Sequence, residues 1–149
     1  MNQTEARLPT GLQAIIEDFH LCEGHEKLEL LLEFAERMPP LPDRFREHRN
    51  GMDQVHECMT PVYVYAETND GKMHFFFDIP PESPTVRGYA ALLSQGLAGV
   101  APEAMLAIPS DFYHHMGLNQ VLSPQRLNGI SAILAHMKRL AVRDMTPTS

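Results

Sequence analysis

The chain has 149 residues, of which 44% are hydrophobic and 21% charged, and this size suits a single domain at 1–149 with loose tails at 1–9 and 144–149. A formal net charge of -7 argues against a nucleic-acid partner, because phosphate backbones attract clustered lysines and arginines. No apolar run approaches the roughly 20 residues of a membrane-spanning helix, and the N-terminus does not resemble a signal peptide. We therefore expect no membrane contact and a cytoplasmic location.

Two amphipathic helices are predicted near the N-terminus. Apolar residues recur at helical spacing from Leu12 to Phe19. A second apolar stripe runs from Leu28 to Met38 and ends at the two prolines that follow. We expect these helices to pack against each other as an antiparallel hairpin.

The middle of the chain is predicted to form a small sheet. Residues 39–51 are rich in proline and arginine, so we expect an exposed loop there. Strands at 62–66 and 73–77 flank a turn at 68–71, a pattern typical of a β-hairpin. A third short strand is predicted through 52–55.

The second half of the chain is predicted to be helical. One helix is expected from Thr85 to Ala98, two short helices follow, and a long amphipathic helix begins at Ser123-Pro124. Helices that flank a single antiparallel sheet indicate an α+β fold, with the helices packed mainly on one face of the sheet.

The two cysteines have different settings. Cys58 lies between a polar segment and the predicted hairpin, whereas Cys22 ends a predicted helix. In a reducing compartment both should be free thiols. A thiol is nucleophilic only as the thiolate, and Arg44, Arg46 and Arg49, which precede Cys58, could favour that form. The alternative is that Cys58 is an ordinary small buried residue.

Other chemistry is less well supported by the sequence. A zinc site could draw on His20, Cys22 and His25 together with His56 and Cys58, but their spacing lacks the paired-cysteine knuckle of structural zinc, so we expect no metal. The chain also lacks a glycine-rich phosphate loop, a Gly-x-Ser-x-Gly elbow and a His-Glu-x-x-His helix. A cysteine-protease arrangement stays open, because no spacing singles out a partner for the thiol.

Three segments of the chain, in this order, carry a recognisable pattern: Val55-His56-Glu57-Cys58-Met59-Thr60, Glu82-Ser83-Pro84-Thr85-Val86-Arg87-Gly88-Tyr89 and Leu122-Ser123-Pro124-Gln125-Arg126-Leu127-Asn128-Gly129. In these segments the chain resembles the SufE family, the sulfur-accepting partners of cysteine desulfurases. The resemblance extends roughly from Leu12 to Met137 and implies a SufE/IscU-like α+β fold with a small antiparallel three-stranded sheet.

The resemblance also implies a function. Cys58 would accept sulfur as a persulfide from a desulfurase of the SufS type, and the chain would stimulate that enzyme and pass sulfur to an iron-sulfur scaffold. The desulfurase would use pyridoxal phosphate, whereas this chain would need no cofactor and would not itself be an enzyme. Scaffolds that assemble clusters bring several cysteines together, so we do not expect cluster assembly on this chain.

The resemblance assigns further residues to the site. Arg126, Asn128, Arg87 and Glu57 are expected to bind the partner or to support the loop that carries Cys58. Arg126 has a second interpretation, as an ordinary surface charge at the start of a helix.

The chain departs from the family pattern around its cysteine. Glu57 stands where the family has glycine, and Met59-Thr60 stands where it has Gln-Ser. A neighbouring carboxylate should disfavour the thiolate. An alternative function is therefore a protein-binding regulator or a metal-binding module that keeps the fold and has lost sulfur relay.

Overall fold

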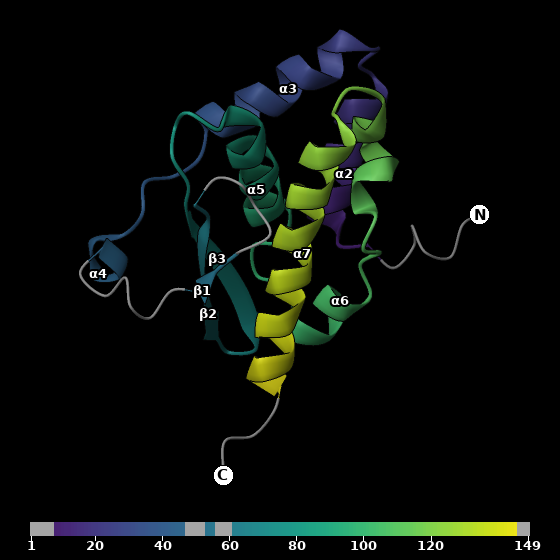
Figure 1. The fold of residues 1–149 in the computed structure, drawn as a ribbon. Helices are drawn as coiled ribbons and strands as arrows, with labels where there is room; N and C mark the ends of the chain where they lie inside the picture. The colour runs from purple at the N-terminus through teal and green to yellow at the C-terminus, as the bar shows by residue number, and fades with distance from the viewer. Residues whose placement is uncertain (1–7, 47–52, 56–60, 146–149) are drawn as a thin grey trace.

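The computed structural model of the chain describes residues 8–46, 53–55 and 61–145. Within them, helices pack against a small antiparallel sheet, mainly on one side of it (Figure 1). The α-helices are α2 (Thr10–His20), α3 (His25–Glu36), α4 (Asp43–Arg46), α5 (Pro84–Gly96), α6 (Pro102–Leu106) and α7 (Pro124–Met145), with the 3-10 helices η2 (Phe112–Met116) and η3 (Leu118–Gln120) before α7. The strands are β1 (Asp53–Gln54), β2 (Tyr63–Asn69) and β3 (Lys72–Asp78).

The predicted β-hairpin is confirmed as β2 and β3. The two strands pair in register from Tyr63 with Asp78 to Asn69 with Lys72. At the turn, Asp70 and Gly71 have φ angles of 54° and 76°, a combination that suits a two-residue turn between twisted strands. The Asp-Gly dipeptide therefore sets the register of the hairpin.

The predicted short third strand is found only as the two residues of β1. β1 contributes only two paired positions, Asp53 with Val64 and Gln54 with Tyr63, so β2 and β3 are the only full strands among the described residues. A full third strand through 52–55 is therefore not found, and residue 52 lies outside the described part. These polar residues lack the alternating apolar pattern that anchors a longer strand in a core.

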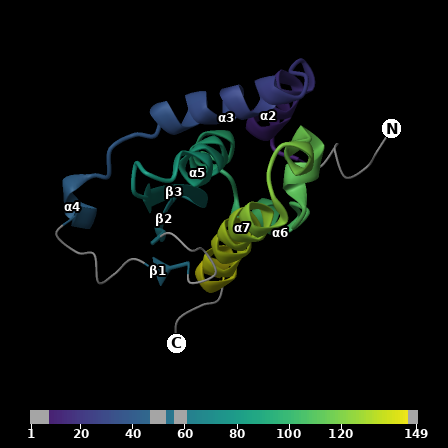
Figure 2. The same ribbon diagram turned by 45° about the horizontal axis from the view of Figure 1, so that its top comes forward.

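Helices α5 and α7 cover the inner face of the sheet, as Figure 2 shows. Val64, Phe75 and Phe77 point to this face and are buried, as the alternation of side chains along a strand requires. The predicted α+β class, with helices packed mainly on one face, is confirmed.

The outer face of the sheet carries an element that the sequence analysis missed. Phe45 of α4 is 4% exposed, and its ring lies 4.2 Å from the ring of Tyr65 and 4.9 Å from that of Phe76, centroid to centroid. The prediction that 39–51 is an exposed loop is therefore wrong at α4. A single aromatic residue among prolines and arginines gives no periodic signal, yet it covers two rings on β2 and β3.

Helix α5 forms the centre of the domain. The run from Tyr89 to Leu93 is buried at every position, which is typical of a helix enclosed on all sides. Both α2 and α3 pack mainly on α5. The prediction that these two helices pack mainly against each other is therefore wrong. They meet through the stacked rings of Phe19 and Phe34, whose centroids are 6.2 Å apart.

The ends of the described chain are more ordered than predicted. Leu8, inside the predicted N-terminal tail, is 4% exposed, and α7 extends to Met145, beyond the predicted start of the C-terminal tail. The remainder of both predicted tails lies outside the described residues. Among the described helices, none is long and apolar enough to cross a membrane.

Candidate functional site

The predicted sulfur acceptor Cys58 and its neighbour Glu57 lie outside the described residues. The described residues on either side of them are Val55 and Val62, which are 1% and 0% exposed. The backbone N–H of Val55 donates to the carbonyl oxygen of Val62 over 2.8 Å. The connection that contains Cys58 in the sequence thus begins and ends at two paired residues of the core.

Arg87, one of the predicted site residues, contacts the chain at the same end of the sheet. Because Tyr63 pairs with Asp78, Val62 lies at the end of the hairpin where β3 finishes and Ile79 follows. Arg87 Nη1 donates to the carbonyl oxygen of Ile79 over 2.6 Å. Arg87 therefore holds the chain that leaves β3 against the first turns of α5.

A cleft of about 680 Å³ lies between α3 and the N-terminal ends of α5 and α7. The structure brings together in it two of the three segments that carry the family resemblance, although they are far apart in the sequence. Arg126 and Asn128, both predicted as site residues, line the cleft and are exposed. The other lining residues are Leu28, Leu32, Glu82, Ser83, Pro84, Thr85, Val86, Val121, Leu122, Ser123, Gln125 and Gly129.

Arg126 contacts the opposite wall of this cleft. Its Nη1 donates to the Thr85 hydroxyl over 2.7 Å, and its backbone N–H donates to Ser123 Oγ over 3.3 Å. Thr85 is only 8% exposed. The sequence analysis quoted Thr85 within a matching segment but assigned it no role, because nothing in the sequence shows that it meets Arg126.

The cleft has a positive character. Neither α5 nor α7 has an acidic residue in its first turn, so neither helix carries a carboxylate of its own there to offset the partial positive charge of its N-terminal end. Arg126 lies in the first turn of α7, where a cation is unfavourable for the helix. Glu82 is the only acidic residue among those that line the cleft. A negatively charged group of a partner would therefore be attracted here.

Cys22 is in a setting that disfavours the thiolate. Burial raises the pKa of its thiol, and the carboxylate of Glu26 raises it further. Its Sγ lies 3.5 Å from the carbonyl oxygen of Asp18, to which it donates. The protonated thiol is a poor nucleophile.

The described residues do not form a metal site. No group of three His, Cys, Asp or Glu side chains within 8–46, 53–55 and 61–145 could hold an ion. His20 Nε2 instead lies 2.7 Å from the carbonyl oxygen of His115. His56 and Cys58, the other half of the zinc alternative, are outside these ranges.

Arg44, Arg46 and Arg49 are predicted as cations that could favour the Cys58 thiolate. Of these three side chains only that of Arg44 is described, and it makes contacts elsewhere. Arg44 Nη2 lies 3.0 Å from Glu67 Oε1 on the outer face of the sheet, and its guanidinium carbon lies 4.7 Å from the centroid of the Phe45 ring. Arg44 is thus engaged with β2 and α4. The Arg46 side chain and Arg49 lie outside the described part of the chain.

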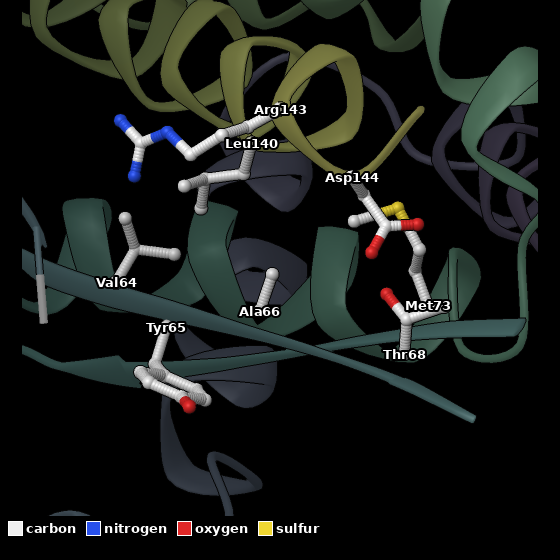
Figure 3. Close-up of a pocket in the computed structure, with 8 residues that line it drawn as sticks. All are labelled: Val64, Tyr65, Ala66, Thr68, Met73, Leu140, Arg143 and Asp144. Carbon is white, nitrogen blue, oxygen red and sulfur yellow. The ribbon is translucent and has the colours of Figure 1, made fainter. Parts of the chain in front are cut away.

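A second hollow of about 350 Å³ lies between β2 and the C-terminal end of α7 (Figure 3). Figure 3 shows Val64 and Ala66 pointing from β2 towards α7, with Tyr65 on the opposite side of the strand. Leu140, Arg143 and Asp144 of α7 line the other side of the hollow. No predicted site residue lines it.

Comparison with known proteins identifies the family to which this chain belongs. Residues 13–141 match the family model described as SufE, Fe-S metabolism associated domain. The chain belongs to the SufE family, as its three matching segments predicted.

Individual relatives agree with this assignment. An uncharacterized SufE-like protein of Mycobacterium tuberculosis is 41% identical over 90% of this chain and 93% of its own length. The sulfur acceptor protein CsdE of Escherichia coli is 30% identical over 76% of this chain and 75% of its own. The solution structure of a hypothetical protein from Thermus thermophilus superimposes with a TM-score of 0.82 at 35% identity, covering 94% of this chain and 99% of that one.

Proposed function

We propose that this chain accepts sulfur on Cys58 from a cysteine desulfurase and passes it on for iron-sulfur cluster assembly. Membership of the SufE family supports the proposal, as does the printed name of a relative, a sulfur acceptor protein. The observation that supports it most is structural. The connection that carries Cys58 in the sequence is closed by the Val55–Val62 hydrogen bond, so its two ends are held together by the core.

The proposed step is a thiolate displacement at sulfur. The Cys58 thiolate attacks the terminal sulfur of a cysteine persulfide on the desulfurase, the sulfur–sulfur bond of the donor breaks, and the donor cysteine leaves as a thiolate. One sulfur atom moves and no net oxidation occurs. The pyridoxal phosphate that first removes sulfur from cysteine belongs to the partner, and this chain supplies only its own thiol.

A single reactive thiol suits this role. A second nucleophilic thiol close by would attack the new persulfide and discharge it as a disulfide. Cys22 is disfavoured as a thiolate, because burial and Glu26 raise the pKa of its thiol. The sulfur on Cys58 would then persist until a downstream iron-sulfur scaffold accepts it. We place this chemistry in the reducing cytoplasm, where both cysteines remain thiols.

Contact with the desulfurase is expected at the cleft between α3, α5 and α7. Arg126 and Asn128 are exposed there, whereas Arg87 supports the turn after β3 from within the fold. Docking of a desulfurase of the SufS type against Arg126 would stimulate its turnover. Glu57 next to the acceptor would lower the fraction of Cys58 thiolate and so slow the transfer.

Mass spectrometry of the intact chain tests the proposal. The wild-type chain is incubated with desulfurase and cysteine, and Cys58→Ser and Cys22→Ser are the matched variants. We expect added sulfur on the wild type and on Cys22→Ser but not on Cys58→Ser, with faster alanine release only from the first two. Added sulfur on Cys58→Ser, or binding of the desulfurase without sulfur transfer to the wild type, would reject the relay.

A further inference from the structure

Thr85 is a polar residue in an unusual position. Apart from Tyr89, whose ring belongs to the hydrophobic core, Thr85 and His136 are the only buried polar residues among those described. Thr85 lies in the first turn of α5, one residue after Pro84, and its hydroxyl oxygen is the acceptor for Arg126 Nη1 at 2.7 Å. A buried hydroxyl that accepts from a guanidinium forms a charge-assisted bond, which is stronger than a bond between neutral groups.

Arg126 needs such an acceptor to keep one position. An arginine side chain has several rotatable bonds and loses rotamer entropy when it is fixed in one position. The first turn of α7 repels the charge rather than holding it. No carboxylate among the described residues is within ion-pair distance of Arg126. The hydroxyl of Thr85 is therefore the side-chain contact that fixes the guanidinium.

The contact also determines where the charge is presented. It spans the cleft from α7 to α5, so the guanidinium lies among residues of both walls. A guanidinium has five N–H donors in one plane and can bind a carboxylate through two of them while a third contacts a hydroxyl. Both helix N-terminal ends at the cleft add partial positive charge.

We propose that Thr85 is a positioning residue for partner docking, which holds the Arg126 guanidinium ready to bind a carboxylate side chain of the desulfurase. The proposal rests on the proposed function, since it takes the desulfurase as the partner. Thr85 acts through Arg126 and does not touch the transferred sulfur. Its loss should therefore weaken docking and leave the reactivity of Cys58 unchanged.

Four variants test the role of the hydroxyl. Thr85→Val keeps the shape of the side chain and removes the acceptor, whereas Thr85→Ser keeps the acceptor. Arg126→Ala removes the donor. Ser131→Ala is the control, because Ser131 Oγ donates to the Leu127 carbonyl oxygen over 2.8 Å within α7 and does not line the cleft.

The dissociation constant for a desulfurase that binds the wild-type chain is measured by calorimetry at low and high salt. We expect Thr85→Val to weaken binding about tenfold or more, as for loss of one hydrogen bond to a charged group. Thr85→Ser and Ser131→Ala should stay within about twofold of the wild type. In sulfur-transfer kinetics, Thr85→Val should raise the KM for the desulfurase and leave kcat unchanged.

A double-mutant cycle decides whether Thr85 acts through Arg126. In the Arg126→Ala background, Thr85→Val should have no further effect on binding or on its salt dependence. Additive effects, or a Thr85→Val variant that folds and binds as the wild type does, would overturn the positioning role. Unchanged binding by Arg126→Ala would also overturn the positioning role. In any of these cases, sulfur transfer to Cys58 of the wild type would still support the proposed function. Absence of sulfur transfer to the wild type would instead reject the proposed function.

Discussion

Gly88 of α5 lies so close to the Leu31 carbonyl oxygen of α3 that a side-chain carbon at this position would overlap it. The overlap is with backbone, which cannot rotate away as a flexible side chain can. This close approach lets α3 pack along α5, where Leu31 is fully buried. Gly88 belongs to the second segment of the family resemblance. The packing of α3 on α5 requires a residue without a side chain at this position.

Gly88→Ala is expected to destabilise the fold by about 1–3 kcal/mol, because the two helices must move apart to admit the methyl group. Urea denaturation measures the change in the free energy of unfolding. The control is Gln95→Ala on the exposed side of the same helix, which should stay within about 0.5 kcal/mol of the wild type. Equal stability of the two variants would show that the helices do not need this approach.

Phe45→Ala is expected to lower the free energy of unfolding by about 2–3 kcal/mol, because a buried ring and its contacts with Tyr65 and Phe76 are lost. Arg44→Ala removes the ion pair with Glu67, in which the two side chains are 55% and 32% exposed, and the contact of the guanidinium with the Phe45 ring; it should cost about 1 kcal/mol. Thermal and chemical denaturation compare the variants. A larger loss for Arg44→Ala would mean that charge, and not the ring, holds α4 to the sheet.

The reactivity of Cys22 can be measured alone in the Cys58→Ser variant. Because burial and Glu26 raise the pKa of Cys22, we expect the folded chain to react with iodoacetamide more slowly than the chain unfolded in urea at pH 8. Glu26→Gln should speed the folded reaction, since it removes the negative charge and keeps an acceptor for the Glu23 backbone N–H. Equal rates in the folded and unfolded chains would contradict the raised pKa.

The same shift gives a pH dependence of stability. The pKa of Cys22 is higher in the folded chain than in the unfolded chain, so the folded chain binds the proton more tightly. Its stabilising contribution is complete below the unfolded pKa and is lost as pH rises through the folded pKa. The free energy of unfolding should therefore fall above the ordinary thiol pKa of about 8.5, and less so in Cys22→Ser.

The Tyr89 hydroxyl is fully buried and has no hydrogen-bond partner among the described residues. Burial raises the pKa of Tyr89 far above its usual range, so the group remains neutral. Tyr89→Phe should leave stability unchanged or raise it by up to about 1 kcal/mol, because it removes an unsatisfied polar group. Tyr113→Phe on the partly exposed η2 is the control. A loss of more than about 1 kcal/mol in Tyr89→Phe would reveal a partner for the hydroxyl.

Arg87→Met is expected to cost about 1–2 kcal/mol of stability, because the Ile79 carbonyl loses a charged donor while the aliphatic stem is kept. Arg37→Met is the matched control, since Arg37 is 57% exposed and its pair with Glu33 spans 3.7 Å. It should have a small effect. Similar losses of stability in both variants would show that the hydrogen bond from Arg87 to Ile79 does not stabilise the fold more than an exposed ion pair does.

Much of the fold was predictable from local patterns. The alternation of Met73, Phe75 and Phe77 and the Asp70-Gly71 turn specify a hairpin, since side-chain direction and turn geometry depend on neighbouring residues. The stripe from Ile130 to Leu140 likewise specifies α7, and these residues are buried. The position of Phe45 was not predictable, because its partners Tyr65 and Phe76 are distant in sequence.

The sequence by itself determined the longer helices, the hairpin and the order of the three segments, including the place of Cys58 within the first. Those properties follow from residue identity and short-range periodicity. Only the tertiary structure decided that Arg126 meets Thr85, that Arg87 supports Ile79, and that segments 82–86 and 121–129 line one cleft. Such contacts arise from the packing of α3, α5 and α7 around a common core, and no local pattern encodes which distant side chains then become neighbours.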